Sequence, residues 1–139
     1  ESNPFYTINF PSVDRNIFTV GAYDTINNSM WPPSSRGPNI RNLQKPNIVA
    51  PGVNIISSYP NNRYGMITGT AASAAFTSGV AALFFQYVTQ NNRYKRQGFT
   101  QSIYTFFRLG ADRNDGVIYP NFIEGYGLLN ARKIFEKFR

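Results

Sequence analysis

A chain of 139 residues, 42% hydrophobic and 16% aromatic, is long enough for one small folded domain and too apolar to be disordered. The absence of cysteine excludes disulfides and thiolate metal sites, and leaves the compartment undetermined. The absence of histidine means that the chain cannot by itself supply the general base of a Ser-His-Asp triad. The net charge is +7, and the basic residues are scattered along the sequence, which is typical of a solvated surface. Binding of an acidic partner or of nucleic acid is a weaker interpretation of this charge.

The chain begins at Glu1 without an initiator methionine, so we expect a processed or trimmed piece of a longer protein. Its most apolar segment is interrupted by Ser73, Thr77 and Ser78 and is expected to end at Gln86, which is short of a membrane span. We therefore expect no membrane partner.

Several short strands are predicted before residue 68. Residues 16–24 alternate early and end apolar, which predicts a strand buried in a sheet. Residues 25–45 are rich in Asn, Ser, Pro, Gly and Arg, and predict a loop. Residues 45–58 predict two short strands separated by a tight turn at Pro51 and Gly52. A further short strand is predicted over residues 64–67.

The stretch from Gly69 to Phe85 is small, apolar and uncharged, and predicts the central helix of the domain. A helix of this composition is expected to be buried on all sides. The small residues at its start let another backbone or a ligand approach closely. A helix N-terminus carries unpaired N–H groups and a partial positive charge, so the position of Gly69 and Thr70 suits an oxyanion.

Two shorter helices are predicted in the last third of the chain. The first covers residues 101–109, with Thr100 as its N-cap and Gly110 as its C-cap. The second follows an N-cap at Asn130. Polar and basic residues at positions 89–98 connect the central helix to this part of the chain.

Four segments, in this order along the chain, resemble the subtilisin-like serine proteases (peptidase S8): residues 10–24, 46–56, 69–83 and 125–130. Residues 69–83 resemble the family's nucleophile segment, Gly-Thr-Ser-Met-Ala-x-Pro-x-Val-x-Gly, and residues 46–56 resemble its Pro-Asp-Ile-x-Ala-Pro-Gly segment. The resemblance implies an α/β fold: residues 1–139 would form the C-terminal part of a three-layer domain with a mainly parallel sheet and a buried central helix. It also implies that the catalytic aspartate and histidine and the oxyanion-hole asparagine lie on chain preceding Glu1.

The family pattern places Ala71 at the nucleophile position, Ala75 at the usual proline, and Phe76 at the next position, which is often histidine. Alanine has no oxygen with which to attack a carbonyl, so this sequence cannot form an acyl-enzyme. Ala71 has three interpretations: natural loss of the nucleophile, an engineered inactivation, or a helix that never carried a nucleophile. We favour natural loss because Ala75 and Phe76 also depart from the pattern.

Thr70 matches the family residue whose hydroxyl and backbone assist the oxyanion hole, and a plain helix cap is its alternative role. Ser73 lies two positions beyond Ala71, roughly 200° around the helix, so we expect it to pack rather than to replace the nucleophile. No cofactor is expected. No metal is expected either, because no carboxylate lies near the asparagines that would offer a cation their carbonyl oxygens.

The hypothesis that follows is a catalytically inactive subtilisin-like domain with a binding or regulatory role. Residues 101–113, 119–121 and 126–130 resemble the clostridial germination-specific (Csp) proteases. This resemblance implies a role in spore germination, partners among other germination proteins, and a spore or secreted location. The resemblance also implies packing against the N-terminal remainder of the domain and its propeptide. The alternatives are an active endopeptidase captured as a Ser-to-Ala variant and, from another class, a basic nucleic-acid-binding module, which the motifs disfavour.

Overall fold

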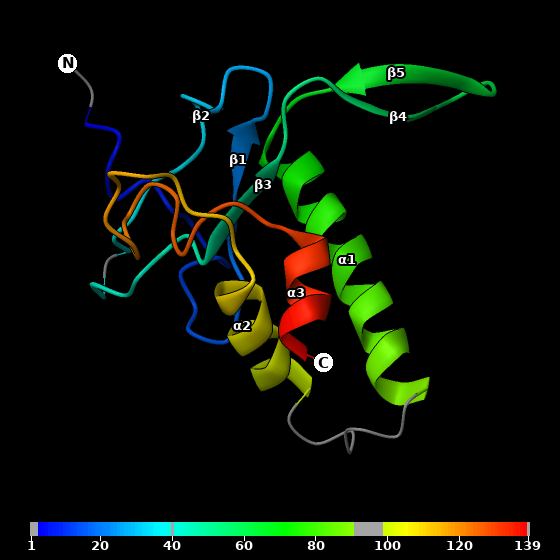
Figure 1. Ribbon diagram of the computed structural model, residues 1–139. Coiled ribbons are helices and arrows are strands. Elements are labelled where there is room, and N and C mark those ends of the chain that lie inside the picture. The colour runs from blue at the N-terminus through cyan, green and yellow to red at the C-terminus, as the bar shows by residue number, and fades with distance from the viewer. Residues whose placement is uncertain (1–2, 40, 91–98, 139) are drawn as a thin grey trace.

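The computed structural model describes residues 3–39, 41–90 and 99–138. The strands and helices are β1 (Val20–Asp24), β2 (Ser29–Met30), β3 (Ile48–Pro51), β4 (Ile55–Tyr59), β5 (Arg63–Ile67), α1 (Thr70–Gln90), α2 (Phe99–Leu109) and α3 (Ala131–Phe138). β1 pairs in parallel with β3 and antiparallel with β2, while β4 and β5 form a separate antiparallel hairpin. Figure 1 shows α1 beside β3, α2 and α3 below the strands, and the β4–β5 hairpin extending away above α1. The α/β class predicted from the sequence is confirmed.

The two parallel strands are almost entirely buried. Ala22 in β1 and residues 48–50 in β3 are fully shielded from solvent. Uniformly apolar strands of this kind are typical of parallel pairing, in which both faces of the sheet are covered. The strand predicted over residues 16–24 is shorter in the structure, because Asp14 accepts a hydrogen bond from the backbone of Asn16 in a turn that precedes β1.

Helix α1 is buried on one face only, so the expectation of a helix buried on all sides is wrong for the described chain. The buried face repeats every three to four residues, at Ala72, Ser73, Thr77, Val80, Phe84 and Val88. It packs against β1 and β3, whereas on the opposite face Leu83 is 58% exposed and Phe76 is 47% exposed. The prediction failed because composition reports how apolar a helix is, and not how many neighbours cover it.

Helix α1 also continues to Gln90, beyond the expected end at Gln86. The hydroxyl groups of Thr77 and Ser78 do not interrupt it, because they donate hydrogen bonds to carbonyl oxygens one turn earlier, at 2.8 and 2.9 Å. With 21 residues and a mean hydropathy of 1.3, α1 could cross a membrane by length and composition alone. The core helix of a folded domain passes the same test, and the packing of α1 on β1 and β3 is of that kind.

Aromatic side chains join the three helices into one core. The ring of Phe84 in α1 lies 6.1 Å from that of Phe107 in α2 and 6.0 Å from that of Phe135 in α3, measured between centroids. Gly110, which follows the end of α2 as predicted, permits this packing, because a Cβ there would lie 2.7 Å from the backbone nitrogen of Ile134.

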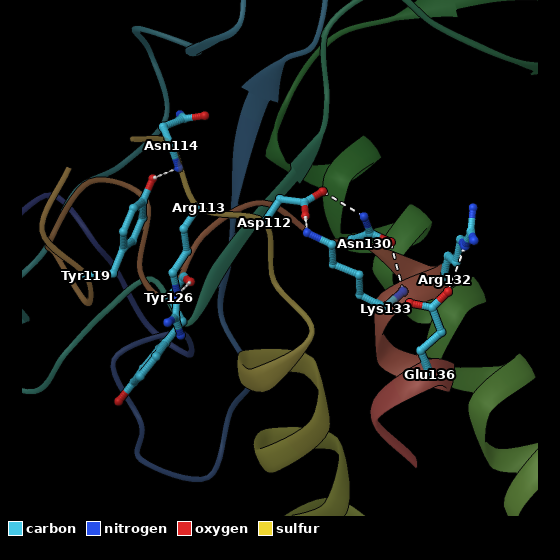
Figure 2. Close-up of polar contacts among 9 residues, drawn as sticks. All are labelled: Asp112, Arg113, Asn114, Tyr119, Tyr126, Asn130, Arg132, Lys133 and Glu136. Atoms are coloured by element: carbon cyan, nitrogen blue, oxygen red, sulfur yellow. Dashed lines mark hydrogen bonds and ion pairs between the residues drawn. The ribbon is translucent and has the colours of Figure 1, made fainter. Parts of the chain in front are cut away.

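Asn130 caps α3, as the sequence predicts. Its side-chain oxygen accepts a hydrogen bond from the backbone N–H of Lys133 at 3.0 Å, and its amide nitrogen donates to Asp112 at 2.7 Å (Figure 2). These bonds tie α3 to the segment that follows α2. Thr100, the expected N-cap of the preceding helix, lies inside α2, which begins at Phe99. Residues 91–98 of the predicted connector lie outside the described residues.

Candidate active site

The N-terminus of α1 lies at the edge of the sheet where β3 ends. The backbone N–H of Gly69 donates to the carbonyl oxygen of Gly52, the residue after β3, at 2.8 Å. The carbonyl oxygen of Gly69 accepts the first bonds of the helix, from the N–H groups of Ala72 and Ser73 at 3.1 and 3.4 Å. Gly69 has a φ of 150°, which favours glycine at this turn into the helix. The carboxyl edge of parallel strands is where open α/β sheets bind their ligands.

Gly52 and Ser73 hold α1 against the sheet. Ser73 is fully buried, and its Oγ donates a hydrogen bond to the carbonyl oxygen of Ala50 at 3.0 Å. A Cβ at Gly52 would lie 2.1 Å from this Oγ, so glycine is required for the approach. Ser73 is therefore a packing residue, as predicted.

Thr70 and Ala71 form the first turn of α1, and both are exposed. Gly69 occupies the cap position, so Thr70 lies inside the helix and not at its cap. Neither the hydroxyl of Thr70 nor the N–H groups of Thr70 and Ala71 have a hydrogen-bond partner among the described residues. Three free donors at a helix N-terminus are suited to binding an oxygen that carries negative charge.

A hollow of about 200 Å³ lies beside Thr70. Gly21 of β1 and Ser34 of the following loop form part of its wall. Ser34 is fixed there because its Oγ accepts a hydrogen bond from the backbone N–H of Ala22 at 3.0 Å. The loop predicted over residues 25–45 thus contributes to the surroundings of the helix N-terminus.

The side chain of Ala71 is a methyl group, which offers no nucleophile, acid or base. Ala75 lies one turn further along α1, and it and Phe76 are also exposed. These three residues extend an uncharged surface from the free donors along the helix. The donors at this position can therefore hold a ligand oxygen, whereas Ala71 offers no atom that could form a bond to its carbon.

Asp24 and Asp112 are described carboxylates with shifted pKa values, and neither shift suits a general base. Hydrogen bonds from Asn27 hold the pKa of Asp24 below its ordinary value. Burial raises the pKa of Asp112, but hydrogen bonds from Lys133 and Asn130 outweigh this effect and lower it. A general base at neutral pH needs the opposite shift. Within the described ranges, no three or more His, Asp or Glu side chains come together as metal ligands.

Comparison with known proteins agrees with this geometry. Residues 1–127 match the Subtilase family (peptidase S8). The serine protease AprX of Bacillus subtilis is 35% identical over 100 aligned residues, which cover 58% of this chain and 23% of AprX. The structure of the Clostridium perfringens CspB protease superposes with a TM-score of 0.85 and 31% identity, and the match covers 95% of this chain and 29% of CspB. The prenylagaramide maturation protease PagA, at 23% identity and a TM-score of 0.79, has the same fold over 98% of this chain and 47% of PagA.

The fold and the helix N-terminus at the sheet edge define the class, which is a subtilisin-like α/β domain. The chain belongs to the subtilase family of serine proteases. It spans about a quarter of the length of AprX and CspB.

Two contributors to the site were not predicted from the sequence. Gly52 was expected only as a turn residue, and its contact with Ser73 joins distant parts of the chain. Ser34 was expected only within a loop. For Gly52 the sequence does contain a signal. The spacing between the Pro-Gly turn and the Gly-Thr pair is part of the family resemblance, and it relates Gly52 to the start of α1.

Proposed function

We propose that this chain is part of a catalytically inactive subtilisin-like domain that binds or regulates a partner without cutting it. Ala71 occupies the nucleophile position, and Thr70 with the first turn of α1 is what remains of the oxyanion-binding region. The observation that carries the proposal is the methyl group of Ala71 beside free N–H donors. Such donors can hold a carbonyl or carboxylate oxygen of a peptide, but the side chain at the nucleophile position has no atom that can attack it.

Natural loss of the nucleophile explains the neighbouring residues better than a single engineered change. Ala75 and Phe76 differ from the family pattern as well, and both are exposed on α1 beyond Ala71. An engineered inactivation requires a change at the nucleophile only. The proposal therefore assigns Ala71 to the natural protein.

The proposal includes a second portion of the same domain as the first partner. Residues 1–139 form the C-terminal portion, and an N-terminal portion with the catalytic aspartate, histidine and oxyanion asparagine packs against it. The exposed apolar face of α1 supports this arrangement, since Phe76, Leu83 and Phe85 are 47%, 58% and 40% exposed. The proposal also includes a propeptide and other germination proteins as further partners and a spore or secreted location, as the resemblance to the germination-specific proteases implies.

A hydrolysis assay on the full-length protein, expressed from its natural gene, tests this proposal. The protein is incubated with casein and with a fluorogenic peptide, and a heat-inactivated sample serves as the blank. We expect no hydrolysis above the blank. Turnover that a serine-directed inhibitor abolishes would overturn the proposal.

The second candidate is an active serine endopeptidase captured as a Ser-to-Ala variant. The geometry of Gly69 favours this candidate. Its turn and its hydrogen bond to Gly52 leave the N–H groups in the first turn of α1 accessible to a substrate. The natural coding sequence decides between the two candidates. A serine codon at position 71 supports the endopeptidase, and an alanine codon supports the inactive domain.

A further inference from the structure

A basic hollow lies at the end of the parallel strands opposite to the N-terminus of α1. It consists of two neighbouring depressions of about 200 and 290 Å³, which share Arg15 and Arg108 as lining residues. Lys45, just before β3, lines the smaller depression, and Tyr104 of α2 lines the larger one. Among the described residues, no carboxylate lines either depression. The hollow is therefore a concave surface with three cationic side chains.

The guanidinium of Arg108 is held in place without being neutralised. It lies over the ring of Tyr126 at 4.5 Å and over that of Tyr104 at 5.2 Å, measured to the ring centroids. Its side chain forms no hydrogen bond or ion pair with a described residue, and its buried Nε is without a partner. Aromatic stacking fixes the position of a guanidinium but leaves its positive charge uncompensated.

Lys45 is a second cation without a carboxylate partner among the described residues. It is 2% exposed, and its Nζ donates to three uncharged oxygens, the carbonyl of Ile17, the hydroxyl of Thr19 at 3.0 Å and the side chain of Asn47 at 3.2 Å. Position 47, which is aspartate in the family pattern, is asparagine in this chain, so it places no negative charge beside the ammonium.

Burial, together with the nearby charge of Arg108, lowers the pKa of Lys45 to about 8, while Asp14 acts in the opposite direction. Lys45 is thus positively charged at neutral pH. Asp14 is exposed, accepts a hydrogen bond from the backbone of Asn16 at 2.7 Å, and forms no ion pair with Lys45.

We propose that this hollow binds a small dianion that carries carboxylate or phosphate-type oxygens. Arg15, which is exposed at the mouth, and Arg108 supply the hydrogen bonds, because the planar guanidinium matches both kinds of oxyanion in a two-pronged geometry. Lys45 contributes only its positive charge, because its ammonium group already donates hydrogen bonds to three protein oxygens. The described ion pairs of the chain, Arg132–Glu136 and Lys133–Asp112, lie elsewhere. Asp14 is the described carboxylate whose charge acts on Lys45 and Tyr104, and it forms no ion pair with a described cation. The site is independent of the proposed function at Ala71.

Calorimetric titration of the full-length protein with sulfate and with malonate tests the proposal. Chloride at matched ionic strength serves as the control ligand. We expect saturable binding of at least one dianion at one site per chain. Preference for sulfate identifies a phosphate-type ligand, and preference for malonate identifies a dicarboxylate.

Arg15→Gln alters an exposed side chain and is expected to weaken binding about tenfold, as the loss of a charge-assisted hydrogen bond does. Arg63→Gln, at an exposed arginine of the β4–β5 hairpin, is the matched control and is expected to leave the affinity unchanged. Affinity in the unmodified protein should also fall as the pH rises through about 8, because Lys45 then loses its charge. No saturable binding of either dianion, or equal losses in the two arginine variants, would overturn the proposal.

Discussion

The Oγ of Ser73 occupies the space that a side chain at Gly52 would need, because a Cβ at that glycine would lie 2.1 Å from it. The same Oγ bonds to the carbonyl oxygen of Ala50, and the carbonyl oxygen of Gly52 accepts a hydrogen bond from Gly69. The first turn of α1, which contains Ala71, is therefore positioned through the contact between Gly52 and Ser73.

Gly52→Ala is expected to lower the free energy of unfolding by about 1–3 kcal/mol, the usual cost of an added group in a packed interior. In the Ser73→Ala background the cost of the same change should be smaller, because the Oγ that causes the clash is gone. Part of the cost should remain, since the new Cβ also lies 2.8 Å from the Cβ of Ala22. Urea unfolding of the two single variants and the double variant measures this. Strictly additive costs would show that the contact does not matter.

Lys45 is expected to make stability depend on pH above neutrality. Its pKa is lowered from 10.5 to about 8 in the folded protein by burial and by Arg108, with Asp14 opposing. Below pH 8 the lysine is charged in both states, so the penalty for burying the charge is complete. Between pH 8 and 10.5 the unfolded state binds more protons than the folded state, so this residue's contribution to stability rises with pH.

Lys45→Met should remove this pH-dependent increase in the free energy of unfolding. The comparison is the difference in unfolding free energy between the unmodified protein and the variant, measured from pH 7.5 to pH 10 in chloride buffers. That difference should shift in favour of the unmodified protein as the pH increases. Lys137→Met, at an exposed lysine of α3, is the control and should give a flat difference. A flat profile for Lys45→Met as well would contradict the shifted pKa.

The uncovered face of α1 is expected to be buried in the full-length protein. Leu83→Asp should then cost about 2–4 kcal/mol of unfolding free energy, because a carboxylate is placed in an apolar contact. Ile118→Asp, at a residue that is 87% exposed and lies outside α1, is the matched control and should be nearly neutral. Equal effects of the two substitutions would show that Leu83 faces solvent.

The strands β3, β4 and β5 could be predicted from the sequence because the turn formers Pro51 and Gly52 and the Pro-Asn-Asn turn at residues 60–62 separate them. The caps of α1 at Gly69 and of α3 at Asn130 also have local signals, a small-residue turn and a side-chain acceptor. Local pattern thus identified most of the elements, whereas the assignment of Ala71 to the nucleophile position came from the family resemblance and β2 was missed within the predicted loop.

What could not be predicted depends on contacts between distant residues. The one-sided burial of α1 is set by the neighbours that the chain provides, and the basic hollow joins Arg15, Lys45 and Arg108 from three separate segments. None of the three has a neighbouring residue in sequence that marks it as part of a site. Periodicity and composition do not contain such information.

The central claim, that a subtilisin-like scaffold is present without its nucleophile, is tested most directly by covalent labelling. The full-length protein from its natural gene is treated with a fluorophosphonate probe, which reacts with activated serine hydroxyls, and its intact mass is measured. AprX, labelled in parallel, is the positive control for the probe. We expect no added mass on this protein. An adduct at position 71, or at another serine such as Ser73, would contradict the account.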